Sequence, residues 1–231
     1  MPSETLYAIP GFADPFSSLS HLIGAAVCVG LSVPLVRKGL DARHDDGRKR
    51  GVGHVASLVI FGAAAVLLLT MSGVFHMLGP GAPRTVFQRL DHAAIFVLIA
   101  GTMTPIHAIL FRGVWRWGML AFVWMLAVAG VTLKSIYFDM VPQALGVGLY
   151  LGMGWLGLAS MILLARRYGA PMVVPLVLGG LAYTAGAAVE WAEPGAIIPG
   201  VVRAHEMFHV AVLLGLALHW WFVWRTAGVR T

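Results

Sequence analysis

Charged residues are scarce in this sequence. Of its 231 residues only 11% are Asp, Glu, Lys or Arg, whereas 59% are hydrophobic. Soluble domains usually carry about 25% charged residues. The deficit indicates an integral membrane protein rather than a soluble domain. The net charge is +6, but no nucleic-acid binding is expected, because Lys and Arg collect in the cytoplasmic loops of membrane proteins.

Cysteine is almost absent as well. The single cysteine, Cys28, lies inside an apolar run. It has no partner for a disulfide within the chain, and a metal cluster built from several thiolates is excluded. A metal site would have to draw on the nine histidines instead.

Long apolar runs, in contrast, recur along the whole chain. A helix needs about 20 apolar residues to cross a bilayer. Seven segments meet this requirement, at residues 17–36, 54–76, 91–111, 115–134, 143–165, 172–190 and 202–224. We therefore predict an all-α integral membrane protein, with one seven-transmembrane-helix bundle as its single domain over residues 1–231. The glycine-rich run at 146–157 predicts close helix packing through small faces.

The distribution of Lys and Arg predicts an orientation. If the seven segments alternate in direction, twelve of the 16 Lys and Arg residues lie at one membrane face. The four at the other face are Arg84, Arg89, Lys134 and Arg203. The positive-inside rule then places the N-terminus outside the cell membrane (inner or plasma membrane) and the C-terminus in the cytoplasm.

Three polar clusters lie at the ends of apolar segments, where ionisable residues are costly and often functional. They occupy residues 72–76, 89–92 and 205–209. The alternation of the segments places all three at the same membrane face. Residues four apart share one face of a helix. His205 and His209 therefore form one stacked polar pair, and Ser72 and His76 form another.

Three imidazoles and one water are a common catalytic zinc arrangement. We therefore predict that His76, His205 and His209 bind Zn2+. Asp91 is the candidate for orienting a ligand or the bound water, or for acting as a base. Ser72 is the candidate for a hydrogen bond to the same water.

The other polar residues of these segments have simpler interpretations. Three histidines are interpreted as hydrogen-bonding partners between helices: His21, His107 and His219. Arg89 is expected to anchor the membrane interface or to pair with an acid. Glu190 and Glu193 are expected to be solvated loop acids.

Residues 205–209 also read His-Glu-x-x-His, the zinc-protease pattern, in which the Glu is the general base. Such proteases usually take their third ligand from a downstream position, and the only downstream candidate here is His219. Ten helical residues separate it from His209, which is about 15 Å along the axis and too far to share a metal. The protease interpretation is therefore weak, and Glu206 is expected to face interfacial water.

Taken together, the motifs resemble the hemolysin III family, the bacterial branch of the progestin and adiponectin receptor (PAQR) family. The resemblance rests on Ser72-x-x-x-His76, Asp91-His92 and His205-x-x-x-His209, and on residues 19–24, which are similar to the family's Thr-His-x-x-Gly opening. It implies a seven-helix bundle that holds one zinc ion through the same three histidines. It also implies that Asp91 and Ser72 lie close to the zinc-bound water. The wider superfamily includes alkaline ceramidases, which implies hydrolysis of a lipid amide.

Two classes of function follow, both with membrane lipids as partners. The first is a zinc-dependent lipid hydrolase, with an apolar cavity, open to the bilayer, that leads to the metal and admits an acyl chain. The second is a non-enzymatic sensor or regulator of membrane state, in which zinc is structural and Asp91 is a candidate fourth ligand. A hemolysin or pore is less favoured, because the polar residues gather at one face and do not line a path across the bilayer.

Overall fold

The described part of the chain is almost entirely helical. The computed structural model of the protein describes residues 9–44, 52–193, 195, 198 and 201–228. Among these residues β-structure is limited to two isolated bridges. The predicted all-α class is therefore confirmed.

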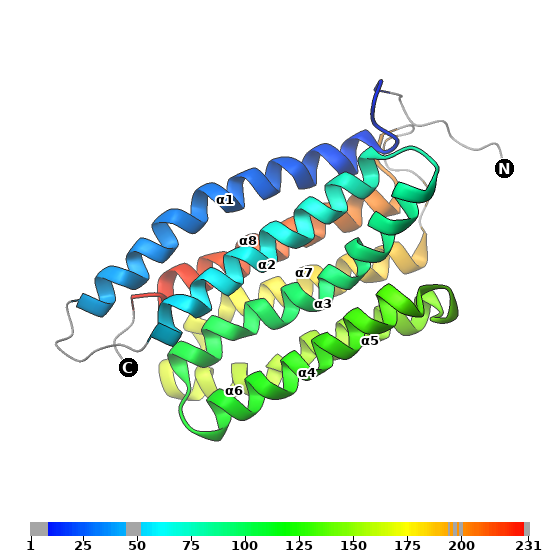
Figure 1. Ribbon diagram of the computed structural model, residues 1–231. Coiled ribbons are helices and arrows are strands. Elements are labelled where there is room, and N and C mark those ends of the chain that lie inside the picture. Colours follow the sequence, from blue (N-terminus) through cyan, green and yellow to red (C-terminus); the bar gives the residue numbers. More distant parts are fainter. Residues whose placement is uncertain (1–8, 45–51, 194, 196–197, 199–200, 229–231) are drawn as a thin grey trace.

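Seven helical segments build the bundle (Figure 1). In chain order the helices are α1 (Pro15–His44), α2 (Val52–Met77), α3 (Ala82–Leu110), α4 (Val114–Ile136), the short 3₁₀ helix η1 (Phe138–Met140), α5 (Gln143–Trp155), α6 (Gly157–Tyr168), α7 (Ala170–Ala192) and α8 (Ala204–Thr226). α5 and α6 together form one interrupted segment. The described residues thus contain seven segments that are long and apolar enough to cross a membrane, as the sequence predicts.

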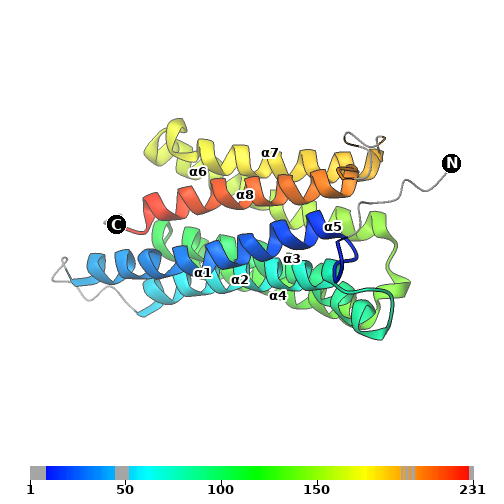
Figure 2. The same ribbon diagram turned by 90° about the horizontal axis from the view of Figure 1, so that it is seen from above.

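The segments are arranged as a ring in which neighbours in sequence pack together. Contacts run from α1 through α2, α3 and α4 to α5, and from α6 through α7 to α8, which returns to α1. Figure 2 shows α7 and α8 on the side opposite α2 and α4. α3 is the most buried segment because it also contacts α5 and α8. Large apolar side chains such as Phe61, Leu69 and Phe222 fill the interior, whereas Ile23 and Val27 of α1 point outward, as expected for a surface in lipid.

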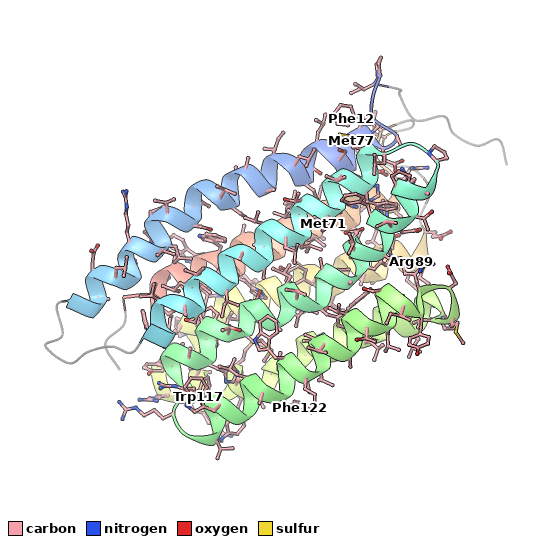
Figure 3. All side chains as sticks on the ribbon, viewed as in Figure 1. Phe12, Met71, Met77, Arg89, Trp117 and Phe122 are labelled. Carbon is pink, nitrogen blue, oxygen red and sulfur yellow. The ribbon has the colours of Figure 1, made fainter. Side chains whose placement is uncertain are left out.

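The bundle has two distinct ends. Since seven segments alternate in direction, the start of α1 and the end of α8 lie at opposite ends (Figure 1). We call the end that contains the start of α1, the end of α2 and the start of α8 the histidine end. Figure 3 shows Phe12, Met77 and Arg89 at this end and Trp117 at the opposite end.

Three helices differ from the sequence prediction in extent. α1 ends at His44, eight residues beyond the predicted end at 36, because its polar residues continue the helix past the apolar run. α3 begins at Ala82, nine residues before the predicted start at 91. Pro83 fits the first turn of a helix, and the polar residues of α3 that follow it extend the helix beyond the apolar run. The predicted continuous segment 143–165 is interrupted at Leu156, between α5 and α6. The glycines that precede this residue disfavour a continuous helix.

The glycine-rich run does not pack as predicted. A Cβ atom added at Gly148, Gly152 or Gly154 would meet no atom within 4 Å. The prediction of close helix packing through these glycines is therefore wrong. Gly146 is different, because a Cβ atom there would lie 2.7 Å from the Nζ atom of Lys134. The run therefore borders open space over most of its length, and Gly146 makes room for one neighbouring side chain.

Candidate metal centre

Three histidines from two helices converge at the histidine end. The Nε2 atom of His205 lies 3.2 Å from Nε2 of His76 and 3.1 Å from Nε2 of His209. His76 and His209 are buried, and His205 is partly buried. Nitrogen ligands about 2.1 Å from a tetrahedral zinc ion lie roughly 3.4 Å from one another. The three side chains therefore form a group that can hold a metal ion, as the sequence predicts.

Close packing of α1 on α2 shapes one side of this centre. A Cβ atom at Gly73 would collide with the side chain of Leu22, so only glycine permits this approach. Ser18 donates a hydrogen bond to the carbonyl oxygen of Gly73 over 2.8 Å. Just before α1, the backbone N–H of Asp14 donates to the carbonyl oxygen of His76 over 2.8 Å. The chain before α1 is thereby fixed beside the first candidate ligand.

Two carboxylates hold the outer nitrogens of two of the three candidate ligands, and the Nδ1 atom of the third, His209, is buried without a hydrogen-bond partner among the described residues. The Nδ1 atom of His76 lies 3.1 Å from Oδ2 of Asp14, and Nδ1 of His205 lies 3.0 Å from Oε1 of Glu190. An imidazole that donates its Nδ1–H to a carboxylate keeps its Nε2 lone pair free and aimed at the metal. Arg84 donates to the same Asp14 oxygen over 2.8 Å. The hydrogen bonds from His76 and Arg84 hold the pKa of the Asp14 carboxyl well below its usual range.

These carboxylates differ from those expected from the sequence. Glu190 is not a solvated loop acid, because it pairs with His205. Asp14 and Glu190, and not Asp91, orient the rings of His76 and His205. Asp14 was not among the predicted site residues, although an acid directly before the first apolar segment, at the same face as the histidines, is a signal that could have identified it.

Asp91 and Ser72 lie in the same centre, beside the histidines. Ser72 is buried one turn before His76 on α2. The Asp91 carboxyl interacts with the Ser72 hydroxyl and, electrostatically, with His205. Both residues line the cavity that contains the three histidines. The structure therefore brings together all five residues that the sequence predicts for the site.

Three further histidines are those that the sequence analysis interprets as links between helices. Ser160 of α6 lies 3.2 Å from Nε2 of His107, and His219 lies 3.3 Å from the carbonyl oxygen of Leu176 in α7, so both link helices as predicted. His21 instead lies against His209, with ring centroids 4.1 Å apart and ring planes tilted by 42°, and so belongs to the metal centre.

Glu206 serves the fold and does not face the metal centre. Its Oε2 atom accepts a hydrogen bond from the backbone N–H of Arg203 over 3.0 Å, which completes a capping box at the start of α8. Ser17 donates to its other oxygen over 3.4 Å. The side chain is 1% exposed, so the expectation that it faces interfacial water is wrong. Because both carboxylate oxygens of Glu206 accept hydrogen bonds in this way, Glu206 is not placed to act as the general base of a protease.

A cavity of about 730 Å³ contains the centre and extends along the bundle interior. Binding sites for small molecules commonly measure roughly 300–1,000 Å³. Beyond the histidines its walls are mostly apolar, with Leu98, Met103, Leu151 and Leu176 from α3, α5 and α7. The predicted apolar cavity at the metal centre is therefore present, and its opening to the bilayer stays a prediction.

Comparison with known proteins agrees with this architecture. The sequence model of a family described as Haemolysin-III related matches residues 12–220. The chain belongs to the hemolysin III family. It is 28% identical to Hemolysin-3 of Bacillus cereus over 202 residues, which cover 87% of this chain and 86% of that protein. It is also 33% identical to a Hemolysin-3 homolog of Bacillus subtilis (strain 168) over 132 residues, 57% of this chain and 62% of that protein. The family and the seven apolar segments together fit a multi-pass membrane protein.

Proposed function

We propose that this protein is an integral-membrane, zinc-dependent hydrolase that cleaves a lipid amide. The observation that supports this function is the convergence of three histidine Nε2 atoms in an apolar cavity. Three nitrogen donors at tetrahedral spacing suit zinc, whereas magnesium and calcium prefer oxygen ligands. When bound, zinc would supply the Lewis acidity that polarises a carbonyl group and activates water.

In this proposal, Asp91 and Ser72 handle the proton. As the new C–O bond forms and the C–N bond of the amide breaks, Asp91 accepts a proton from the attacking water and returns it to the departing amine. Ser72 interacts with Asp91 and keeps its carboxyl in place beside His205. Asp14 and Glu190 act through His76 and His205, whose rings they orient.

The cavity supports a lipid as the substrate. Apolar walls of α3, α5 and α7 suit an acyl chain, and the histidines at one end suit the polar bond that is cleaved. The exclusion of water by such walls strengthens electrostatic interactions in the centre. Membrane lipids are therefore the proposed partners.

The alternative is a sensor of membrane state with a structural zinc. A structural site is usually closed by a fourth protein ligand. In the described residues the metal-binding group has three donors, and Asp91 is not one of them. An open fourth position favours the hydrolase.

The function is tested with the purified full chain, a panel of lipid amides and two variants. His76→Ala is expected to lose zinc and hydrolysis together. Asp91→Asn is expected to keep zinc but to lose hydrolysis by at least about 100-fold, since general acid–base catalysis contributes 10²–10⁴-fold. Zinc retained in His76→Ala, or full hydrolysis in Asp91→Asn, would overturn the proposal.

We also propose that the histidine end faces away from the cytoplasm in the plasma membrane. The support is the excess of Lys and Arg at the opposite end, which includes Arg112, Arg116, Arg166 and Arg167. A reporter that is active only in the cytoplasm, fused after Thr231, is expected to be active. An inactive reporter, with activity recovered when it is fused to the N-terminus, would reverse the orientation.

A further inference from the structure

Lys134 is a buried cation inside the bundle. It lies near the end of α4, is 4% exposed and lines the same cavity as the metal centre. Within the described part of the chain its ammonium group makes no hydrogen bond and no ion pair, and it lies over the ring of Phe138, 5.2 Å from the ring centre. A charge that faces a largely apolar cavity without a partner is costly, most of all in a membrane. This cost indicates that something else provides the negative charge.

The neighbouring cations of the cavity are already paired. Arg84 forms an ion pair with Asp14 at 2.8 Å, and Arg203 lies 3.6 Å from a carboxylate oxygen of Glu206. Both arginines line the cavity, but their charges are largely balanced. Among the described cations of the cavity, Lys134 is thus the one available to a negatively charged ligand.

Lys134 lies at the depth of the metal centre. α3 and α4 are neighbours that run in opposite directions, and a Cβ atom at Gly130 would touch the ring of Phe96. One helical turn further toward the histidine end, Lys134 and His92 share a neighbour, because the Lys134 Nζ atom and the centre of the His92 ring each lie 5.2 Å from the ring centre of Phe138. His92 directly follows Asp91. A ligand in the cavity can therefore reach Lys134 with one group while another lies at the histidines.

We propose that Lys134 binds the anionic head group, a carboxylate or a phosphate, of a lipid whose acyl chain fills the cavity. An ammonium group and such an anion form charge-assisted hydrogen bonds, which are strong in surroundings of low polarity. Gly146 leaves the space into which the ammonium group extends. This inference rests on the proposed hydrolase and narrows its substrates to acyl amides with an anionic head group.

Binding to the full chain in a non-ionic detergent tests the inference. The probes are oleate and oleyl phosphate, with oleyl alcohol as the neutral reference, and a chelator is present throughout so that no metal attracts the anion. Wild-type protein is expected to bind at least one anionic probe about tenfold more tightly than oleyl alcohol, because hydrogen bonds to charged groups are among the stronger ones. The preferred anion then identifies carboxylate or phosphate as the natural head group.

Three variants assign the preference to Lys134. Lys134→Met is expected to bind all three probes equally, with unchanged affinity for oleyl alcohol, and Lys134→Arg is expected to keep the preference. Lys38→Met is the matched control, because Lys38 donates to the carbonyl oxygen of Trp224 at the opposite end and does not line the cavity. Unchanged binding of oleyl alcohol shows that Lys134→Met is folded. A preference that persists in Lys134→Met, or none in the wild type, overturns the inference.

A second readout separates this inference from the proposed function. Without chelator, N-oleoylglycine is expected to be hydrolysed about tenfold faster than N-oleoylethanolamine at low concentration, and Lys134→Met is expected to lose this difference while it keeps its zinc. Equal rates for the two amides in the wild type contradict the role of Lys134 but leave the hydrolase intact. Absence of hydrolysis together with a Lys134-dependent preference in binding contradicts the hydrolase alone.

Discussion

Histidines are buried at both ends of the bundle, yet they serve different purposes. At the histidine end, the Nε2 atoms of His76, His205 and His209 converge to within 4.8 Å of one another. Toward the opposite end, His107 and His219 lie on separate helices, and each contacts a backbone carbonyl oxygen. Both ends place imidazoles in an apolar interior, so burial alone does not distinguish a ligand from a link between helices.

The partner of the Nδ1 atom distinguishes a candidate metal ligand from a histidine that links two helices. Carboxylates hold Nδ1 of His76 and His205, so the Nε2 atoms are left for a metal. For His107, Nδ1 lies 2.6 Å from the carbonyl oxygen of Trp115, and Ser160 lies beside Nε2, so both nitrogens are occupied. An acid on one nitrogen thus leaves the other to a metal in His76 and His205, whereas the Nδ1 atom of His209 is buried and makes no hydrogen bond among the described residues.

The largest expected effect is the loss of metal-dependent stability in His76→Ala. A ligand present at 100–1,000 times its Kd stabilises the folded state by about 3–4 kcal/mol. A chelator is therefore expected to lower the melting temperature of the wild type and of His107→Ala but not that of His76→Ala. An equal fall in melting temperature on chelation in both variants would contradict the difference between the two ends.

The carboxylates give the next largest effect. Asp14→Asn and Glu190→Gln are each expected to weaken metal binding by about 10–100-fold, because the imidazoles lose the acceptors that orient them. Competition with a metal-sensitive dye measures the affinity. Asp139→Asn is the matched control, since Asp139 pairs with Arg89 at the same end but is exposed. Metal affinity at the wild-type level in both acid variants would contradict their role.

At the opposite end, His107→Ala is expected to lower the free energy of unfolding without affecting the metal. The loss should be about 1–2 kcal/mol, because the carbonyl oxygen of Trp115 and the Ser160 hydroxyl are left without their partner. Thermal unfolding and metal titration of the same sample measure the two quantities. Weaker metal binding in this variant would mean that the two ends are coupled.

The smallest effect is expected for Glu206→Gln. Glutamine can also complete a capping box, so the cost in stability should be below about 1 kcal/mol, and zinc and hydrolysis should be retained. Melting temperature and initial rates check this expectation. A loss of hydrolysis comparable to that of Asp91→Asn would return Glu206 to the role of a general base.

The sequence predicts the helices and the ligands for simple reasons. A membrane crossing needs an apolar run of fixed length, so all seven segments are recognisable. Alternation of the helices and a spacing of four residues are sufficient to bring His76 together with His205 and His209. The interruption at Leu156 and the early start of α3 at Ala82 depend on local backbone preferences, which a count of apolar residues does not detect.

The groups that orient the ligands are harder to predict. Asp14 and His76 are 62 residues apart, and their contact depends on how closely α1 approaches α2 at Gly73. Glu190 sits at the end of α7 among residues that resemble an ordinary loop, and its pairing with His205 arises only when α7 packs on α8. Such contacts between helices are set by side-chain packing and leave no fixed spacing in the sequence.

The metal content of the purified protein is the most direct test of the three-histidine metal centre. The wild type is compared with His205→Ala/His209→Ala and, as a control of equal size, with His107→Ala/His219→Ala. We expect about one zinc ion per chain in the wild type and in the control, and none in the first variant. Zinc retained by His205→Ala/His209→Ala, or no metal in any of the three proteins, would contradict the three-histidine metal centre.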